Sequence, residues 1–185
     1  SDMFCWGFEN GGRLMRATVD AAGTGLTLLT DPVDTAHWPA PGQVVEVLPW
    51  GAVDFNGEKI AAEAEGHFTT VDAGYDPDTG EVTLADAVPA GFNTAWQARA
   101  DAADLETTRF GADEHGPYVF VRVWDRGLDR ASAPAMAIGA AVPLGLTGLT
   151  VTHAGTALRP GDAWIIAARP FAPDDIAPWE LRVGA

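Results

Sequence analysis

Apolar and polar positions alternate along much of the first half of the chain. In segment 13–20 every second residue is apolar, which places the apolar side chains on one face of an extended strand. A glycine-containing turn at 23–25 separates this segment from a second apolar run at 26–29, a spacing that is typical of a hairpin. The pattern therefore predicts two neighbouring antiparallel strands.

Two further strand signals follow. Segment 43–48 is rich in valine and comes directly after the turn dipeptide Pro41-Gly42. Segments 68–72 and 81–84 flank the sequence Asp-Pro-Asp-Thr-Gly, in which proline and glycine occupy positions that favour a tight reversal. We therefore expect a hairpin over 68–84. The acidic residues of its turn do not match a helix-flanked calcium loop, so a plain turn is the better interpretation.

The second half of the chain repeats this pattern. Along 118–124, valines share one face of the strand and three aromatic residues with one arginine share the other, so we expect both faces to be covered. Segment 149–153 alternates again. Segment 163–169 follows a Pro-Gly-Asp turn and is predicted to be another strand.

One segment departs from the strand pattern. Asn93 or Thr94 is a suitable N-cap for a short helix over 95–106, although the low apolar content there equally suits a surface excursion. Short strands separated by turns predict an all-β protein, either a β-sandwich or two small antiparallel β-barrel-like units. The expected division is a first β unit at 3–89, a connecting excursion at 90–116 and a second β unit at 117–185, packed separately or as one domain.

The net charge of the chain limits the kinds of partner that it is expected to bind. The formal net charge of −15 argues against binding to nucleic acid or to an anionic membrane surface, since both need a basic face. No apolar run approaches the roughly 18–20 residues of a membrane-spanning helix, so no membrane insertion is expected. Cys5 is the sole cysteine, which rules out an internal disulfide and a metal site built from cysteines.

Catalytic chemistry has few sequence signals. The four histidines are widely scattered, and Ser132 does not lie in a nucleophile elbow. We therefore predict no catalytic residue, no metal and no cofactor. A hydrolase with a carboxylate pair stays open, because the 26 acidic residues offer many pairs and no motif selects one.

The tryptophans suggest a binding function. Trp124 and Trp164 lie in predicted strands and are expected to pack in the core or between strands. Trp38 and Trp50 flank turns that contain proline, so a position at the rim of the fold is plausible for both. With Trp96, they are the candidate residues for stacking against a sugar ring.

Four stretches, in order along the chain, resemble motifs of one protein family. Segment 4–11 resembles a strand with Phe and Trp that leads into Glu-Asn-Gly, and 41–47 resembles a Gly-Asp-Trp-Val-Glu-Ile turn and strand. Segment 121–125 resembles Arg-Arg-Trp-Asp, and 161–169 is similar to Gly-Asp-Tyr-Trp-Leu-Ile-Pro-Ala-Arg. The family consists of uncharacterised bacterial domains in larger proteins, often beside phage-tail or contractile-injection components.

This resemblance implies an accessory structural or attachment role and supplies no catalytic residue. The family's amino-terminal region, with an Asp-Ala-Asp-Trp-Asn-like motif, has no counterpart here, so the chain resembles a piece of a longer protein. The leading hypothesis is a non-catalytic scaffolding module of a phage-tail-like or cell-surface protein, with other segments of the parent protein or assembly as partners. The alternatives are a carbohydrate-binding module and the hydrolase.

Overall fold

The computed structural model describes residues 3–8, 13–53, 59–92, 118–139, 141–153, 159, 162–169 and 172–178. The chain divides into two compact units, Ser1–Ala154 and Gly155–Ala185. Each unit is described by itself below.

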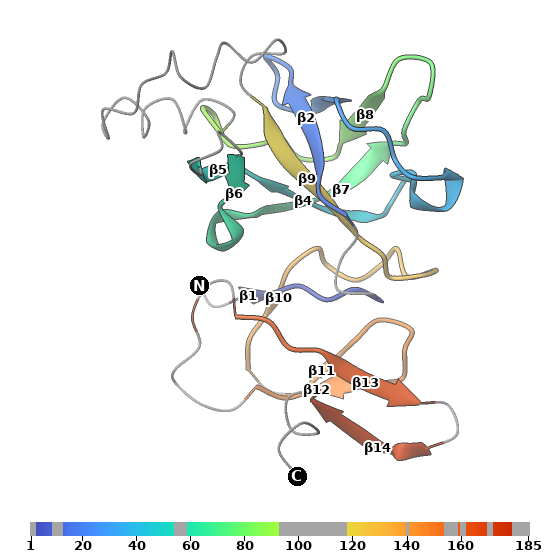
Figure 1. The fold of residues 1–185 in the computed structure, drawn as a ribbon. Coiled ribbons are helices and arrows are strands. Elements are labelled where there is room, and N and C mark those ends of the chain that lie inside the picture. The colour runs from blue at the N-terminus through green and yellow to red at the C-terminus, as the bar shows by residue number, and fades with distance from the viewer. Residues whose placement is uncertain are drawn as a thin grey trace. The chain divides into compact units, whose positions relative to one another are not determined.

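The first unit is built around a closed antiparallel barrel (Figure 1). Its strands follow the order β2-β3-β8-β7-β4-β9, and pairing of β9 with β2 closes the ring. The bounds are β2 Met15–Val19, β3 Gly25–Leu28, β4 Val44–Leu48, β7 His67–Ala73, β8 Glu81–Leu84 and β9 Val119–Trp124.

Each barrel strand directs every second side chain inward. Because apolar residues occupy these inward positions, the barrel interior is apolar. Leu26 of β3, Val47 of β4 and Val121 of β9 belong to this core and are almost completely buried. The hairpin of β7 and β8 contributes Val71 and Val82. Its turn is fixed by Asp76, whose carbonyl accepts a hydrogen bond from the Gly80 amide at 2.7 Å.

A second apolar cluster covers part of the outer face of the barrel. It contains Leu48, Trp50, Tyr118 and Phe120. Trp50 begins strand β5 (Trp50–Val53), which pairs with β6 (Lys59–Ala61) to form a hairpin. Because this hairpin follows β4 directly, it supplies cover for Leu48 on the outer face of β4.

A smaller substructure, here called the Arg126 lobe, consists of residues 3–8, 125–139 and 141–153. Its strands are only two residues long: β1 (Met3–Phe4) pairs with β10 (Met136–Ala137), and β11 (Val142–Pro143) pairs with β12 (Thr150–Val151). The described part of the first unit also contains the short 3₁₀ helices η2 (Thr35–His37) and η3 (Glu63–Glu65). In the second unit, β13 (Ile166–Arg169) and β14 (Ala172–Pro178) form a hairpin.

The all-β prediction is confirmed, and so is the hairpin expected over 68–84. Of the forms expected, the first unit has the antiparallel barrel, which is closed. The expected division between 3–89 and 117–185 is corrected. Strand β9 pairs with β2 and β4, so 119–124 completes the first barrel, and the compact units divide after Ala154 instead.

The helix predicted over 95–106 lies outside the described residues. Among the helices that are described, none is long and apolar enough to cross a membrane.

Candidate functional site

The tryptophans that the sequence grouped as binding candidates differ in burial in the structure. Trp50 is only 1% exposed, and its ring packs against that of Tyr118 with centroids 4.6 Å apart. The expectation of a rim position is therefore wrong for Trp50, because the β5–β6 hairpin folds its ring into the outer cluster. Trp96 lies outside the described residues.

Trp38 is half-buried and follows η2. The N-cap of η2 is Asp34, whose Oδ1 accepts hydrogen bonds from the amides of Ala36 at 2.9 Å and His37 at 3.2 Å. The Trp38 ring meets the Tyr75 ring at a centroid distance of 5.4 Å and an angle of 66°. A capped turn thus places Trp38 against the end of β7.

Tyr75 connects this aromatic pair to an acidic side chain. Burial raises the pKa of its hydroxyl, and the charge of Asp31 together with a hydrogen bond to the Asp31 side chain raises it further. The Tyr75 amide donates to the carbonyl of Pro39 at 2.8 Å. Tyr75 is therefore held by its backbone and lies between Trp38 and Asp31.

Trp124 packs as the sequence predicts. It is half-buried, its ring lies near Phe68, and its Nε1 donates to Glu46 Oε2 at 2.9 Å. The packing expected for Trp164, in the core or between strands, is wrong. That side chain is 46% exposed, because β13 begins only at Ile166 and Trp164 precedes the regular strand.

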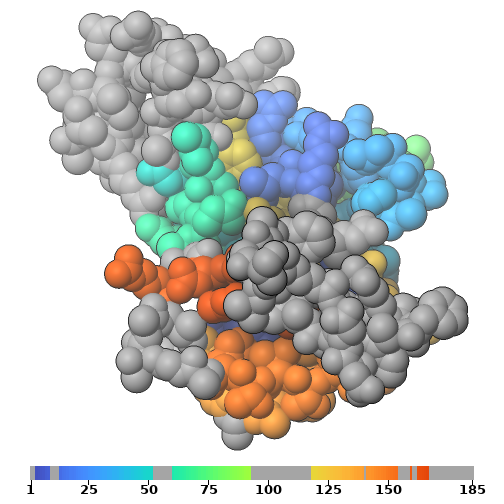
Figure 2. Space-filling model, turned by 60° about the horizontal axis from the view of Figure 1, so that its bottom comes forward, coloured from blue at the N-terminus to red at the C-terminus, as the bar shows by residue number. Residues whose placement is uncertain are grey.

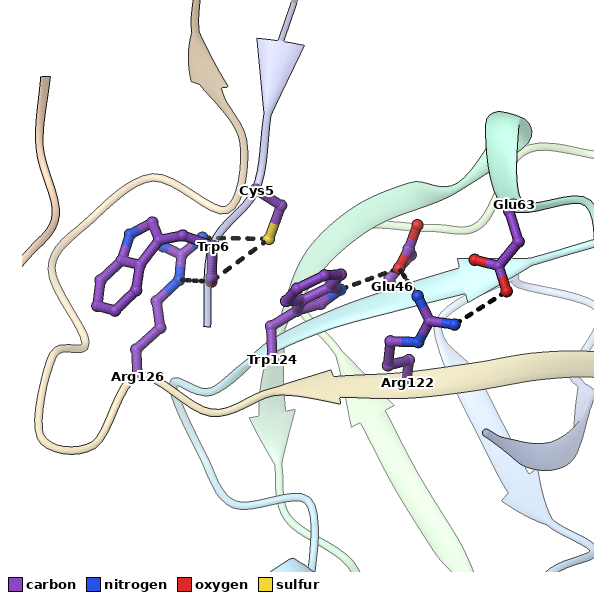
Figure 3. A network of polar contacts seen from close by, with 7 residues as sticks. All are labelled: Cys5, Trp6, Glu46, Glu63, Arg122, Trp124 and Arg126. Carbon is purple, nitrogen blue, oxygen red and sulfur yellow. Dashed lines mark hydrogen bonds and ion pairs between the residues drawn. The ribbon is translucent and has the colours of Figure 1, made fainter. Parts of the chain in front are cut away.

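A polar cluster that the sequence did not single out lies on the outer face of the barrel (Figure 3). Glu46 of β4 is only 4% exposed and carries the carboxylate that accepts from Trp124. Arg122 of β9 lies between two acids, with Nη1 3.5 Å from Glu46 Oε2 and Nη2 2.9 Å from Glu63 Oε1. Burial raises the pKa of Glu46, and the Trp124 hydrogen bond and the Arg122 charge partly oppose that rise.

Glu46 had one sequence signal: it is the single charged residue in the apolar run of 44–48. A glutamate at such a position must find a partner when the strand is buried on both faces. Its partner Arg122 lies far along the chain and was not predictable from local pattern.

The Glu46 cluster does not have the arrangement of a paired-carboxylate hydrolase. Such an enzyme needs two acids on opposite sides of the bond to be cleaved. Here the Arg122 guanidinium contacts both Glu46 and Glu63. A cavity of about 230 Å³ in the first unit is lined by other residues: Pro49, Glu65, Ala90, Gly91 and Phe92.

The second polar cluster is centred on Arg126, which is only 3% exposed (Figure 3). Its Nε donates to the Trp6 carbonyl at 3.0 Å. Its terminal nitrogens donate to the carbonyls of Ala133 at 2.9 Å and Pro134 at 2.8 Å, and a longer bond reaches Ser132. The guanidinium also lies 5.1 Å from the Trp6 ring centroid, at a cation–π distance.

Asp129 supports the same turn region. Its Oδ1 accepts hydrogen bonds from the amides of Ala131 at 3.0 Å and Ser132 at 3.1 Å. A hydrogen bond from the Ser132 side chain, together with these backbone bonds and the Arg126 charge, holds the pKa of Asp129 below its usual range. Gly145, which has a φ of +51°, packs directly over Asp129 Oδ2 and the Trp6 ring.

Cys5 is part of the Arg126 cluster, and its thiol is held in the protonated form. Burial raises the pKa of its thiol to about 11, although the Arg126 charge and a 3.4 Å contact from Arg126 Nη2 oppose the rise. Since the reactive form of cysteine is the thiolate, this thiol is unreactive at neutral pH in the folded protein.

Within the described ranges, no group of three or more His, Cys, Asp or Glu side chains is arranged to hold a metal ion. Comparisons with protein-family models, with curated proteins and with solved structures find no match for this chain.

Proposed function

We propose that this chain is a non-catalytic structural module within a larger phage-tail-like or cell-surface protein. It acts as a rigid β body that joins neighbouring segments of the parent protein or assembly. The observation that carries this proposal is the way Arg126 is used. Its guanidinium donates to four backbone carbonyls, those of Trp6, Ser132, Ala133 and Pro134, and so joins two parts of the chain that are far apart in sequence.

The Glu46 cluster supports the same role. A buried carboxylate with a raised pKa is a common feature of catalytic sites, but it is equally found in structural ion-pair networks. Glu46 is bonded to Trp124 and Arg122, and Arg122 reaches on to Glu63 of η3. These contacts join β4, β9 and η3, so the chemistry of the cluster serves cohesion.

The absence of catalysis is tested with a panel of chromogenic esters, glycosides and phosphoesters. The expected result is no turnover above that of buffer for the wild-type protein and for Glu46→Gln. Turnover by the wild type that Glu46→Gln abolishes would contradict the proposal, because it would make Glu46 a catalytic acid. Arg16→Ala, which changes an exposed residue of the barrel, is the matched control for nonspecific loss.

The location is tested by immunogold electron microscopy of cells and particle preparations from the source organism. An antibody against this chain is expected to label phage-tail-like particles or the outer cell surface. Label confined to the cell interior, with none on particles, would reject the proposed setting. Preadsorbing the antibody with purified protein controls for its specificity.

A further inference from the structure

Trp38 and Tyr75 form an aromatic pair at the edge of the barrel core: Tyr75 packs against the core, and the Trp38 ring packs against Tyr75. Loop 31–41 lies at the surface of the face shown in Figure 2, where its light-blue atoms are open to view. Trp38 and Tyr75 are both only half-buried, and Asp31 beside them is exposed. From this arrangement we propose that Trp38, Tyr75 and Asp31 form a binding site for a neutral saccharide, independent of the structural role.

The aromatic rings supply the apolar part of such a site. One face of a sugar ring is lined by C–H groups, and a half-exposed aromatic ring offers a flat apolar surface with a negative π face against which they pack. The centroids of Trp38 and Tyr75 are 5.4 Å apart and their planes meet at 66°. Each ring therefore braces the other and limits its rotation.

Asp31 supplies the polar part. The Tyr75 hydroxyl is hydrogen-bonded to the Asp31 side chain, which orients the carboxylate next to the rings. An ionised carboxylate has about four acceptor positions, so this one bond leaves capacity for sugar hydroxyl groups. Ligand sites commonly combine an apolar surface with a few oriented polar groups in this way.

The backbone around these residues is held in place before any ligand binds. Asp34 caps η2 through two amides, and the Gln43 side chain accepts from the Ala40 amide at 2.8 Å. The Tyr75 amide bonds to Pro39, and a side chain at Gly74 would collide with Pro41 at 2.9 Å. A site that is already ordered avoids part of the entropy cost of binding.

The charge around the aromatic pair decides which saccharides fit. Asp34 and Asp76 are exposed and, with Asp31, give this region three acidic side chains. Of the cations nearby, His37 is paired with Asp34 at 2.7 Å, and Arg16 donates to Thr30, next to Asp31, at 3.3 Å. Uronic and sialic acids would place a carboxylate in this acidic field and be repelled. Neutral hexose and N-acetylhexosamine oligomers carry no such penalty.

The test is isothermal titration of the whole chain with maltohexaose, cellohexaose and chitohexaose, with hexagalacturonate and choline as charged comparators. At least one neutral oligomer is expected to bind, more tightly than either comparator. Trp38→Ala should weaken that binding about tenfold or more, and Asp31→Asn about fivefold. Tyr75→Phe keeps the ring but removes the hydroxyl that orients Asp31, so about a threefold loss is expected.

Trp164→Ala is the matched control, because it removes a half-exposed tryptophan from the second unit and should leave binding unchanged. Amide NMR spectra check that each variant is folded; if Trp38→Ala is not, Asp31→Asn and Tyr75→Phe decide. The proposal is overturned if no neutral oligomer binds, if the folded variants bind as the wild type does, or if hexagalacturonate or choline binds more tightly than every neutral oligomer. None of these outcomes bears on the proposed structural role, which rests on the Arg126 and Glu46 clusters.

Discussion

The barrel and the Arg126 lobe belong to the same compact unit, yet they are stabilised in different ways. Barrel strands of four to seven residues pair on both sides and enclose a core of aliphatic side chains. The lobe has strands of two residues, and at its centre lie Arg126, Asp129 and Trp6. Burial of apolar surface dominates the first region, whereas side-chain hydrogen bonds to the backbone dominate the second.

The difference shows what each kind of core tolerates. An apolar core loses stability in proportion to the volume removed, and neighbouring side chains partly fill the gap. A polar core fails more abruptly, since removing one donor leaves several buried acceptors without a partner. The two regions should therefore respond separately to mutation, and Cys5, the sole cysteine, reports on the lobe.

The largest expected effect is that of Arg126→Ala. It leaves the carbonyls of Trp6, Ala133 and Pro134 without their donor, and we expect the lobe to lose about 4 kcal/mol. The Cys5 thiol should then react with a thiol reagent much faster than in the wild type, while amide exchange in the barrel changes little.

Arg126→Lys should not restore protection, because a lysine lacks the planar fork that reaches several carbonyls. Arg16→Ala, on the exposed face of β2, is the control and should leave Cys5 protected. Cys5 labelling at the wild-type rate in Arg126→Ala would show that Arg126 does not hold the lobe together.

Leu26→Ala should have the complementary effect. Leu26 is almost completely buried in the barrel core, and its truncation should lower the free energy of unfolding by about 3 kcal/mol. Chemical denaturation measures this loss, and Cys5 should stay protected until the whole unit unfolds. Leu146→Ala, at an exposed turn of the lobe, should change stability by less than about 0.5 kcal/mol. Equal losses for the two variants would contradict the assignment of the core.

Substitution of two glycines of the lobe distinguishes the cost of steric overlap from the cost of backbone strain. Gly145 and Gly148 both have positive φ, +51° and +76°, but only Gly145 has atoms where a Cβ would lie. Gly148→Ala should therefore cost about 1 kcal/mol from strain alone, and Gly145→Ala about 1–2 kcal/mol more. Thermal unfolding, together with Cys5 labelling, measures both, and equal effects would show that the Asp129 carboxylate yields easily.

The same contrast explains what the sequence could predict. Strands of the barrel are long enough to show a period of two, so segments such as 13–20 and 68–84 were recognisable. Closure of the barrel was not, because β9 pairs with β2 across a long stretch of chain and leaves no local signal. This nonlocal pairing is also why the expected division after residue 89 was wrong.

The candidate site was less predictable than the fold. Arg126 resembles any polar turn residue in the sequence, and only the folded chain shows that it is buried among carbonyl groups. The proline beside Trp50 indicated a turn, but not that the following hairpin covers the barrel. Tyr75 and Asp31 had no signal of their own, because their contact with each other and with Trp38 depends on the position of the loop 31–41 against β7.

The smallest expected effect is a difference between the barrel and the Arg126 lobe in how their stability depends on pH. The pKa of Glu46 is raised by burial, so its folded-state value lies above the unfolded value of about 4.3. Folding then favours protonation of Glu46, and the barrel loses stability as the pH rises through the raised pKa. The pKa of Asp129 is lowered, so its contribution is present above about 3.9 and is lost as the pH falls through the lowered pKa.

Acidification from pH 7 to about 3 should therefore strengthen the Glu46 contribution and, at its lower end, weaken the Asp129 contribution. Amide exchange, corrected for the intrinsic pH dependence of the exchange rate, measures each region separately. Glu46→Gln should flatten the profile of the barrel above about pH 4.3, and Asp129→Asn that of the lobe below about pH 3.9. The wild-type profile also includes relief of repulsion as the net charge of −15 is titrated, and subtracting each variant's profile removes this shared part. Each subtraction gives the contribution of one carboxylate to the pH dependence of stability. If the Glu46 and Asp129 contributions have the same sign, the two carboxylates do not act oppositely, and the contrast between an apolar and a polar core does not extend to their electrostatics.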